Sequence, residues 1–291
     1  MKRIFLLLLT TLPLVMPQAG AQLSLTVTNL NASLKADSID RQLLRVQYEM
    51  TYLQDTIKPD AKPVHETMRL DAGNRCSRYY SYNAYLCDSI NRTASQSGAS
   101  QESIIRQLQA VGGSSVNYQI YKHYPKGRVT TLDCLSSTRF YCVEKEEKPQ
   151  WTLHPDTTTI LNYLCQKATC HFKGRDWTAW YTLEVPVAEG PWKLYGLPGL
   201  ILRAEDSRRH YRFECSGVEQ CDGEQPISIP RQKGEQVSLK ERNKMYEMYA
   251  EDLIGFITTH TPNVKITVRD KNGNPLTRYK SPYNPIELCS D

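Results

Sequence analysis

The sequence predicts an α+β fold: a mainly antiparallel twisted sheet or partly open barrel, with one long C-terminal amphipathic helix and one shorter helix. Three observations support this prediction. Apolar and polar residues alternate along several segments, which is the pattern of strands with one buried face. An apolar stripe at helical spacing covers residues 239–259. An Asn-Gly pair, which is typical of tight hairpins, follows the alternating residues 264–268.

The strands are predicted by alternation along the chain. Residues 44–52 place Leu, Val, Tyr and Met on one face and mostly charged or polar residues on the other. The same pattern predicts strands at 116–120, 177–185 and 211–215. We expect residues 200–204 to pair with the last of these across a polar turn, because hairpin neighbours join through short polar loops.

Two helices interrupt the strands. Ser238 and Glu241 have capping-box spacing, and the stripe that follows them predicts one helix over 239–259 that packs on a face of the sheet. A shorter helix is predicted over 101–110, with Ser100 as N-cap and a Gly-Gly pair after it. The polar residues 91–98 before it are predicted to form a loop.

The N-terminus predicts export. Lys2 and Arg3 precede an apolar run over 4–16, and residues 19–21 form a small-residue cleavage site, so residues 1–21 have the organisation of a signal peptide. The apolar run is shorter than the roughly 20 residues of a transmembrane helix. We therefore expect a periplasmic or secreted protein in which residues 22–291 form a single domain with no transmembrane segment.

The composition excludes one class of partner. The formal net charge of +5, to which Lys2 and Arg3 contribute, is small and dispersed, so nucleic acid is not an expected partner. The nine Cys residues of an exported chain predict several disulfide bonds, and the odd number leaves at least one Cys unpaired or available to a partner.

Two disulfide bonds are suggested by position. Cys134 and Cys142 are expected to face each other across a hairpin that turns near Thr138. Cys215 and Cys221 flank a segment predicted as a loop and are candidates to close it. The remaining cysteines, among them Cys76, Cys87 and Cys289, are not assigned a partner.

Residues 174–201 are rich in aromatic residues, Gly and Pro. Residues 197–200, Leu-Pro-Gly-Leu, predict a type II turn, with positive φ at Gly199, and Gly196 is expected to allow close approach of the backbone. Four residues are candidates for binding, although aromatic side chains are also common in cores and a structural role is the stronger interpretation. The candidates are Arg175, for which the sequence identifies no acidic partner, Trp180, Tyr181 and Trp192.

The hexapeptide GLPGLI at 196–201 resembles the signature of the GLPGLI family, exported proteins known mainly from bacteria of the Bacteroidetes group and without an established activity. Further segments resemble the family's ordered blocks: residues 165–169, 174–175, 179–182, 190–193 and the ending 283–288. The resemblance implies an exported location and no particular reaction. The cysteine content departs from the family pattern, notably at Cys170 and Cys221.

Established catalytic motifs do not match. His65-Glu66 begins like a zinc-protease helix, but Arg69 stands where the second His is required, and the segment is predicted as a strand. We find no nucleophile elbow, phosphate-binding loop or dinucleotide fingerprint. Cys165, Cys170 and His171 are rejected as metal ligands because a strand over 165–172 places the two cysteines on opposite faces. No catalytic residue, metal or cofactor is therefore predicted.

Three interpretations remain. The first is a noncatalytic binding or accessory module of the cell envelope, with an envelope or outer-membrane protein as partner and Trp180 and Trp192 near the contact. The second is an unrecognised exported enzyme, most plausibly a hydrolase, built from Arg175, Glu184, Asp206 and His210. The third treats the signature as a folding device. A concave pocket that unites the four polar residues favours the enzyme, and a solid core beneath the signature counts against it.

Overall fold

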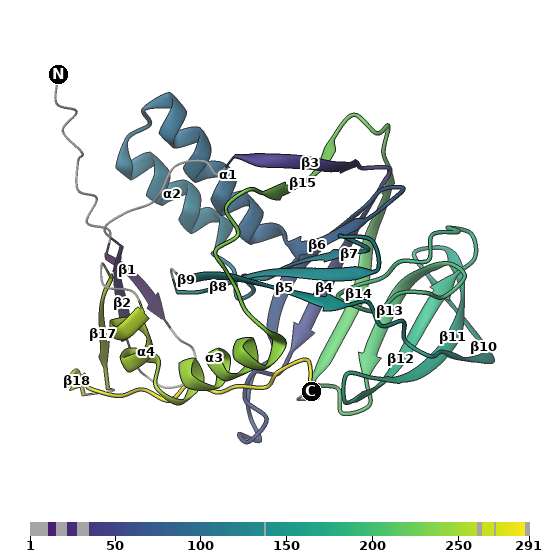
Figure 1. Cartoon of the computed structure of the whole chain (residues 1–291). Coiled ribbons are helices and arrows are strands. Elements are labelled where there is room, and N and C mark those ends of the chain that lie inside the picture. Colours follow the sequence, from purple (N-terminus) through teal and green to yellow (C-terminus); the bar gives the residue numbers. More distant parts are fainter. Residues whose placement is uncertain are drawn as a thin grey trace.

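The structure is a computed structural model of the chain, and it describes residues 11–15, 22–27, 35–136, 138–260, 264–270 and 272–288. In these residues, twelve strands form one twisted sheet (Figure 1). Their order across the sheet is β10 (Thr152–Ile160), β11 (Tyr163–Phe172), β12 (Arg175–Thr182), β13 (Leu200–Asp206), β14 (Tyr211–Gln220), β4 (Leu44–Tyr52), β5 (Val64–Ala72), β6 (Ser77–Ser81), β7 (Gln119–Lys122), β8 (Arg128–Leu135), β9 (Thr138–Lys145) and β16 (Glu235–Gln236).

The strands of this sheet pair antiparallel, except that the short β16 runs parallel to β9. The predicted antiparallel twisted sheet is therefore confirmed, and it is open, with β10 and β16 as its outer strands. Two smaller sheets complete the strands. One pairs β3 (Ala36–Arg41) with β15 (Pro226–Pro230), and the other contains β1 (Thr11–Val15), β2 (Gln22–Val27), β17 (Val264–Arg269) and β18 (Pro275–Leu276).

Alternation predicted the central strands well. β4 spans the predicted residues 44–52 and buries Leu44, Val46, Tyr48 and Met50 while the residues between them stay at least partly exposed. β13 and β14 pair as predicted. β12 begins two residues earlier than predicted and ends at Thr182.

The hairpin between β17 and β18 is confirmed, with Gly273 at a φ of 85° in its turn. β5 contains the His65-Glu66 pair, so that segment is a strand as predicted.

The predicted long C-terminal helix is wrong in one respect, because it is two helices. α3 (Leu239–Glu251) begins at the predicted capping box of Ser238 and Glu241, and α4 (Leu253–His260) follows it. Asp252, at φ −150°, interrupts the helical conformation. Its carboxylate accepts a hydrogen bond from the Gly255 amide at 3.1 Å, as an N-cap does, so it begins α4 rather than continuing α3.

The predicted short helix is confirmed as α2 (Gln101–Val111), with Ser100 as N-cap and Gly112 as C-cap. The predicted loop over 91–98 is wrong, because these residues belong to α1 (Tyr82–Ser97) and its cap at Gly98. α1 begins where the Ser81 hydroxyl accepts a hydrogen bond from the Ala84 amide, and it lies beside α2 (Figure 1). This packing stabilises a helix whose polar composition resembles a loop.

The predicted disulfide bonds are not formed among the described cysteines, all of which are free. The hairpin of β8 and β9 closes between Leu135 and Thr138, so Cys142 lies opposite Thr131, and Cys134 lies opposite Arg139. Cys215 and Cys221 are not joined across a loop, because β14 continues as extended chain to Gln220. Cys289 lies outside the described residues.

The structure describes only residues 11–15 of the predicted signal peptide. Lys2, Arg3 and the cleavage site at 19–21 lie outside the described residues, and β1 falls within the predicted signal peptide. In the part of the chain that the structure describes, we find no helix with the length and apolarity needed to span a bilayer.

Candidate functional site

The signature loop, residues 183–199, connects β12 to β13 and packs into the main core. Trp192 is 1% exposed, and its ring centroid lies 5.6 Å from that of Trp177 and 5.9 Å from that of Phe172. Its φ of 52° is a left-handed conformation that costs roughly 1–2 kcal/mol in a non-Gly residue. Burial of the indole offsets this cost. The core beneath the signature is therefore solid.

The two glycines of the signature have roles other than those predicted. Gly199 is not at positive φ, and the Leu200 amide donates to the carbonyl of Val185 instead of closing a turn on Leu197. The predicted type II turn is therefore wrong. A Cβ on Gly199 would lie 2.7 Å from the carbonyl carbon of Thr182. Glycine is therefore required at position 199 because the backbone there passes very close to the end of β12. Positive φ occurs at Gly196 instead, at 89°.

Arg175 has an acidic partner, contrary to the sequence interpretation. Its Nη1 lies 2.8 Å from Oδ2 of Asp206, and both side chains are 1% exposed. The remaining donors of its guanidinium bind the C-terminal segment: Nε donates to the Ile286 carbonyl at 2.8 Å, and Nη2 donates to Asn284 Oδ1 at 2.9 Å and to the Pro285 carbonyl. Arg175 thus anchors the C-terminal segment to β12 and β13.

Lys193 forms a second anchor for the same segment. It is 3% exposed, and its ammonium pairs with Glu287 at 2.7 Å and with Glu144 of β9. Burial opposes the charged form of Glu287, but Lys193 and Arg242 more than offset this, so the pKa of Glu287 is lowered. Three sequence segments that carry the family resemblance therefore meet in buried, fully structural contacts.

A third buried ion pair holds the middle of the signature loop. Lys122 of β7 is fully buried, pairs with Glu189 at 2.5 Å and donates to the Gly190 carbonyl at 2.7 Å. His123 lies between Glu189 and Glu146. Although burial opposes ionisation, Lys122 and His123 lower the pKa of Glu189 to about 2. The loop is thus held by charge as well as by apolar packing.

The four predicted binding residues do not gather at one surface. Arg175, Tyr181 and Trp192 are buried, and the Tyr181 hydroxyl donates to Gln166 Oε1 at 2.8 Å. Trp180 is half-buried on the other face of β12. A binding role for these four residues stays a prediction.

The alternative enzymatic set is divided. Arg175, Asp206 and His210 do come together, with Nη1 of Arg175 3.5 Å from Nδ1 of His210. They meet at the buried ion pair described above. Glu184 lies elsewhere, in a groove at the other end of β12, where its carboxylate accepts a hydrogen bond from the Leu164 amide at 2.8 Å.

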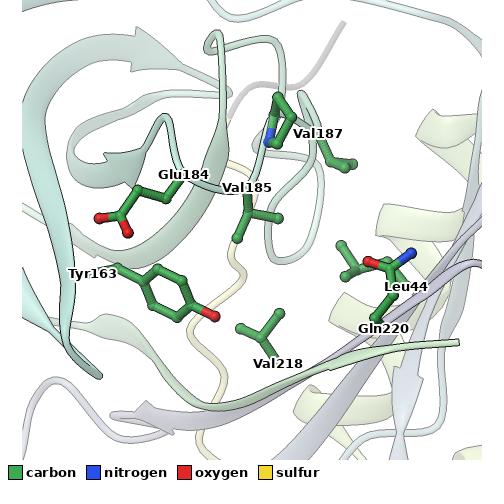
Figure 2. Close-up of a pocket in the computed structure, with 8 residues that line it drawn as sticks. Leu44, Tyr163, Glu184, Val185, Val187, Val218 and Gln220 are labelled. Carbon is green, nitrogen blue, oxygen red and sulfur yellow. The ribbon is translucent and has the colours of Figure 1, made fainter.

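This groove adjoins the signature loop and has a cavity volume of about 500 Å³. Figure 2 shows one wall formed by residues of β14 and β4 and the opposite wall formed by the first residues of the signature loop. Five of its eight lining residues are aliphatic or Pro, and the lining includes one acidic and no basic side chain: Leu44, Tyr163, Glu184, Val185, Pro186, Val187, Val218 and Gln220.

Two exposed leucines are sequence neighbours of residues that line the groove. Leu164 is 62% exposed and Leu183 is 60% exposed, next to Tyr163 and Glu184 of the lining. Sequence reasoning missed Leu44, Val218 and Gln220 because alternation assigns a side chain to a face but does not say where two strands separate. The Ser216-Gly217 pair within β14 was the available signal, since a glycine inside a strand often accompanies a bulge.

No curated protein sequence matches the chain. Two solved structures of PNGF-II, in P21 and C2 space groups, have TM-scores of 0.47 at 13% and 12% identity, covering 72% of this chain. The chain spans 34% of the length of these proteins. The family described as "Protein of unknown function (Porph_ging)" matches residues 172–203, from the end of β11 into β13, and this is consistent with the GLPGLI resemblance without establishing it.

Proposed function

We propose that the chain is a noncatalytic binding or accessory module of the bacterial cell envelope, and that it binds its partner at the groove between β14 and residues 184–187. The observation that carries this proposal is the preformed groove itself. Its volume of about 500 Å³ and its combination of aliphatic residues with a few polar groups fit a binding site. Residues 1–21 are proposed as a signal peptide and residues 22–291 as a single domain, as predicted from the sequence.

The buried ion pairs around the signature favour a rigid support for this groove. Lys122 and Glu189 hold the loop directly after the groove wall, at residues 187–189. A site whose walls are held in place before binding loses less conformational freedom on binding.

In vivo photo-crosslinking tests the proposal. A crosslinking residue replaces Gln220, which lines the groove and is exposed, and a control crosslinker replaces the exposed Glu247 on α3. Trp192, which is buried, is unsuitable for this purpose. We expect a specific envelope protein to be captured from position 220 and not from position 247. Capture should be lost when Val187→Trp fills the groove.

The proposal fails if the position-220 variant is folded and exported and captures nothing that position 247 does not. It also fails if Val187→Trp, with a thermal unfolding midpoint close to that of the wild type, leaves the capture unchanged.

An exported hydrolase is the second candidate, and a specific pair of residues favours it. His171 Nδ1 lies 2.7 Å from Asp176 Oδ1 beside a second pocket of about 350 Å³ that Ser207 also lines. A Ser nucleophile, a His base and an Asp that orients it form a known catalytic combination. Both His171 and Asp176 are about two-thirds exposed, which ranks this candidate second. Labelling of Ser207 by a fluorophosphonate, abolished by His171→Ala, would establish it, and unlabelled protein would exclude a serine hydrolase here.

A further inference from the structure

β14 changes its neighbours part-way along its length. Its first half pairs with β13, but the pairing ends at Arg203 and Glu214. The register with β4 then shifts by one residue between Cys215 and Gly217, which places a β-bulge at Ser216. Bulges bend and twist a strand, so β14 separates from β13 at this point while it remains paired with β4 as far as Gln220.

The direction of the backbone groups beyond the bulge follows from the hydrogen bonds to β4. The Cys221 amide donates to the Leu43 carbonyl, so this residue directs its backbone groups toward β4. Successive residues of a strand direct their N–H and C=O groups to alternate sides. Val218 and Gln220 therefore direct theirs away from β4, and both residues line the groove.

The first residues of β13 hydrogen-bond to the signature loop rather than to β14. Leu200 donates its amide to the Val185 carbonyl, and Ile201 donates its amide to the Glu189 carbonyl. Because neighbouring strand residues direct their amides to opposite edges, only one of these two bonds lies on the β14 side of β13. The groove lies between the signature loop and β14 (Figure 2). In the described part of the chain, no strand pairs with the groove side of β14 beyond Glu214.

We infer that the groove binds an extended polypeptide segment, which adds to the free edge of β14 as a further strand and hydrogen-bonds to the backbone of Val218 and Gln220. This inference rests on the proposed binding function and names the chemical class of the partner. Backbone donors and acceptors on a free strand edge are a template for an added strand. Strand addition supplies affinity through the backbone and specificity through alternate side chains.

The side chains around the groove indicate the character of the peptide. The lining provides apolar contacts at Val185, Val187 and Val218, and its only charged member is the acidic Glu184. An apolar peptide with a basic residue complements this surface, because a charge of opposite sign favours encounter and register. An acidic peptide is disfavoured.

A phage-displayed library of random twelve-residue peptides, selected on the full exported chain, tests the inference. The selected peptides are then measured against two variants. Val218→Pro removes the N–H that faces the groove but no hydrogen bond to β4, and proline is tolerated at such edge positions. Val218→Thr keeps the N–H and a similar shape, so it is the matched control. We expect Val218→Pro to weaken binding by about tenfold or more and Val218→Thr to retain it.

Peptide N-methylation gives an independent readout that leaves the protein unchanged. Two versions of a selected peptide carry methyl groups on the odd or on the even backbone amides. Only one edge of the peptide pairs with β14, so one version should lose binding and the other should keep it. This comparison decides the question even if Val218→Pro fails to fold.

The possible outcomes separate the two proposals. If groove-binding peptides are selected but neither N-methylation nor Val218→Pro affects them, strand addition is wrong and a groove that binds through side chains remains. If no selected peptide depends on the groove, strand addition is also wrong. The crosslinking from position 220 then decides the proposed function by itself.

Discussion

Replacement of Gly199 by Ala tests whether the signature is a folding device. The residue is buried, and its Cβ would lie 2.7 Å from the carbonyl carbon of Thr182 and closer still to the carbonyl oxygen. Real Cβ atoms essentially never approach other atoms within 3.0 Å, so a main-chain segment has to move. Thr182 is paired with Leu200 in the sheet, and the movement therefore strains the ladder between β12 and β13.

The expected cost follows from this geometry. Overpacking of a core costs roughly 1–3 kcal/mol, and a clash with backbone rather than with a flexible side chain places Gly199→Ala near 3 kcal/mol by the same estimate. For a chain of this size, each kcal/mol lowers the thermal midpoint by roughly 2–4 °C, so a decrease of about 6–12 °C is expected. Differential scanning calorimetry and urea unfolding measure both quantities.

Gly217→Ala is the matched control. Like Gly199, Gly217 has no positive φ, but no atom lies within 4 Å of its added Cβ. Replacement there should change stability by no more than about 0.5 kcal/mol, since it only restricts the unfolded chain. Equal stabilities of the two variants would refute the assignment of Gly199 to close packing.

Three further predictions concern buried groups. Arg175→Met leaves the Asp206 carboxylate buried without its partner and should cost about 3–5 kcal/mol in urea unfolding; a loss below about 1 kcal/mol would contradict the anchoring role. Glu189 has a pKa lowered from 4.5 to about 2, so its contribution to stability is present above pH 4.5 and disappears as the pH falls toward 2. In Glu189→Gln, the free energy of unfolding should therefore depend less on pH below 4.5 than in the wild type. An equal pH dependence in the two proteins would be inconsistent with the ion pair. Burial raises the pKa of the Cys215 thiol to about 12, so iodoacetamide should modify it more slowly than Cys221 in the native protein and at a similar rate after unfolding.

Local features of the fold could be predicted because they depend on neighbours in sequence. Alternation located β4 to the residue, and the Ser238–Glu241 spacing located the beginning of α3. The end of α3 could not be predicted in the same way. Residues 239–259 keep an apolar stripe across Asp252, and the interruption depends on that carboxylate capping the next helix. Helix propensity is lower over 253–260, which includes Gly255, two Ile and two Thr, yet both segments are helical, so propensity does not place the interruption at Asp252 and the cap does.

The glycines of the signature show the limit of turn rules. A Leu-Pro-Gly-Leu sequence satisfies the local requirements of a type II turn. The structure uses Gly199 for a contact with Thr182, which lies in the preceding strand, and the Leu200 amide binds Val185. Both partners lie more than ten residues away in the chain. A rule that considers four successive residues cannot contain this information.

The same separation explains why the signature did not reveal a binding site. Arg175 has no acidic neighbour in sequence, but the register of β12 with β13 places Asp206 opposite Trp177, two residues from Arg175 along the strand. Once the register is known, the ion pair follows. The segments that resemble the family converge on this pair and on Lys193, in contacts that close the core. The groove, by contrast, is lined largely by residues outside them, and the matched residues 172–203 contribute only one of its walls. A search for ligands of this protein is therefore better directed at β14 than at the GLPGLI sequence itself.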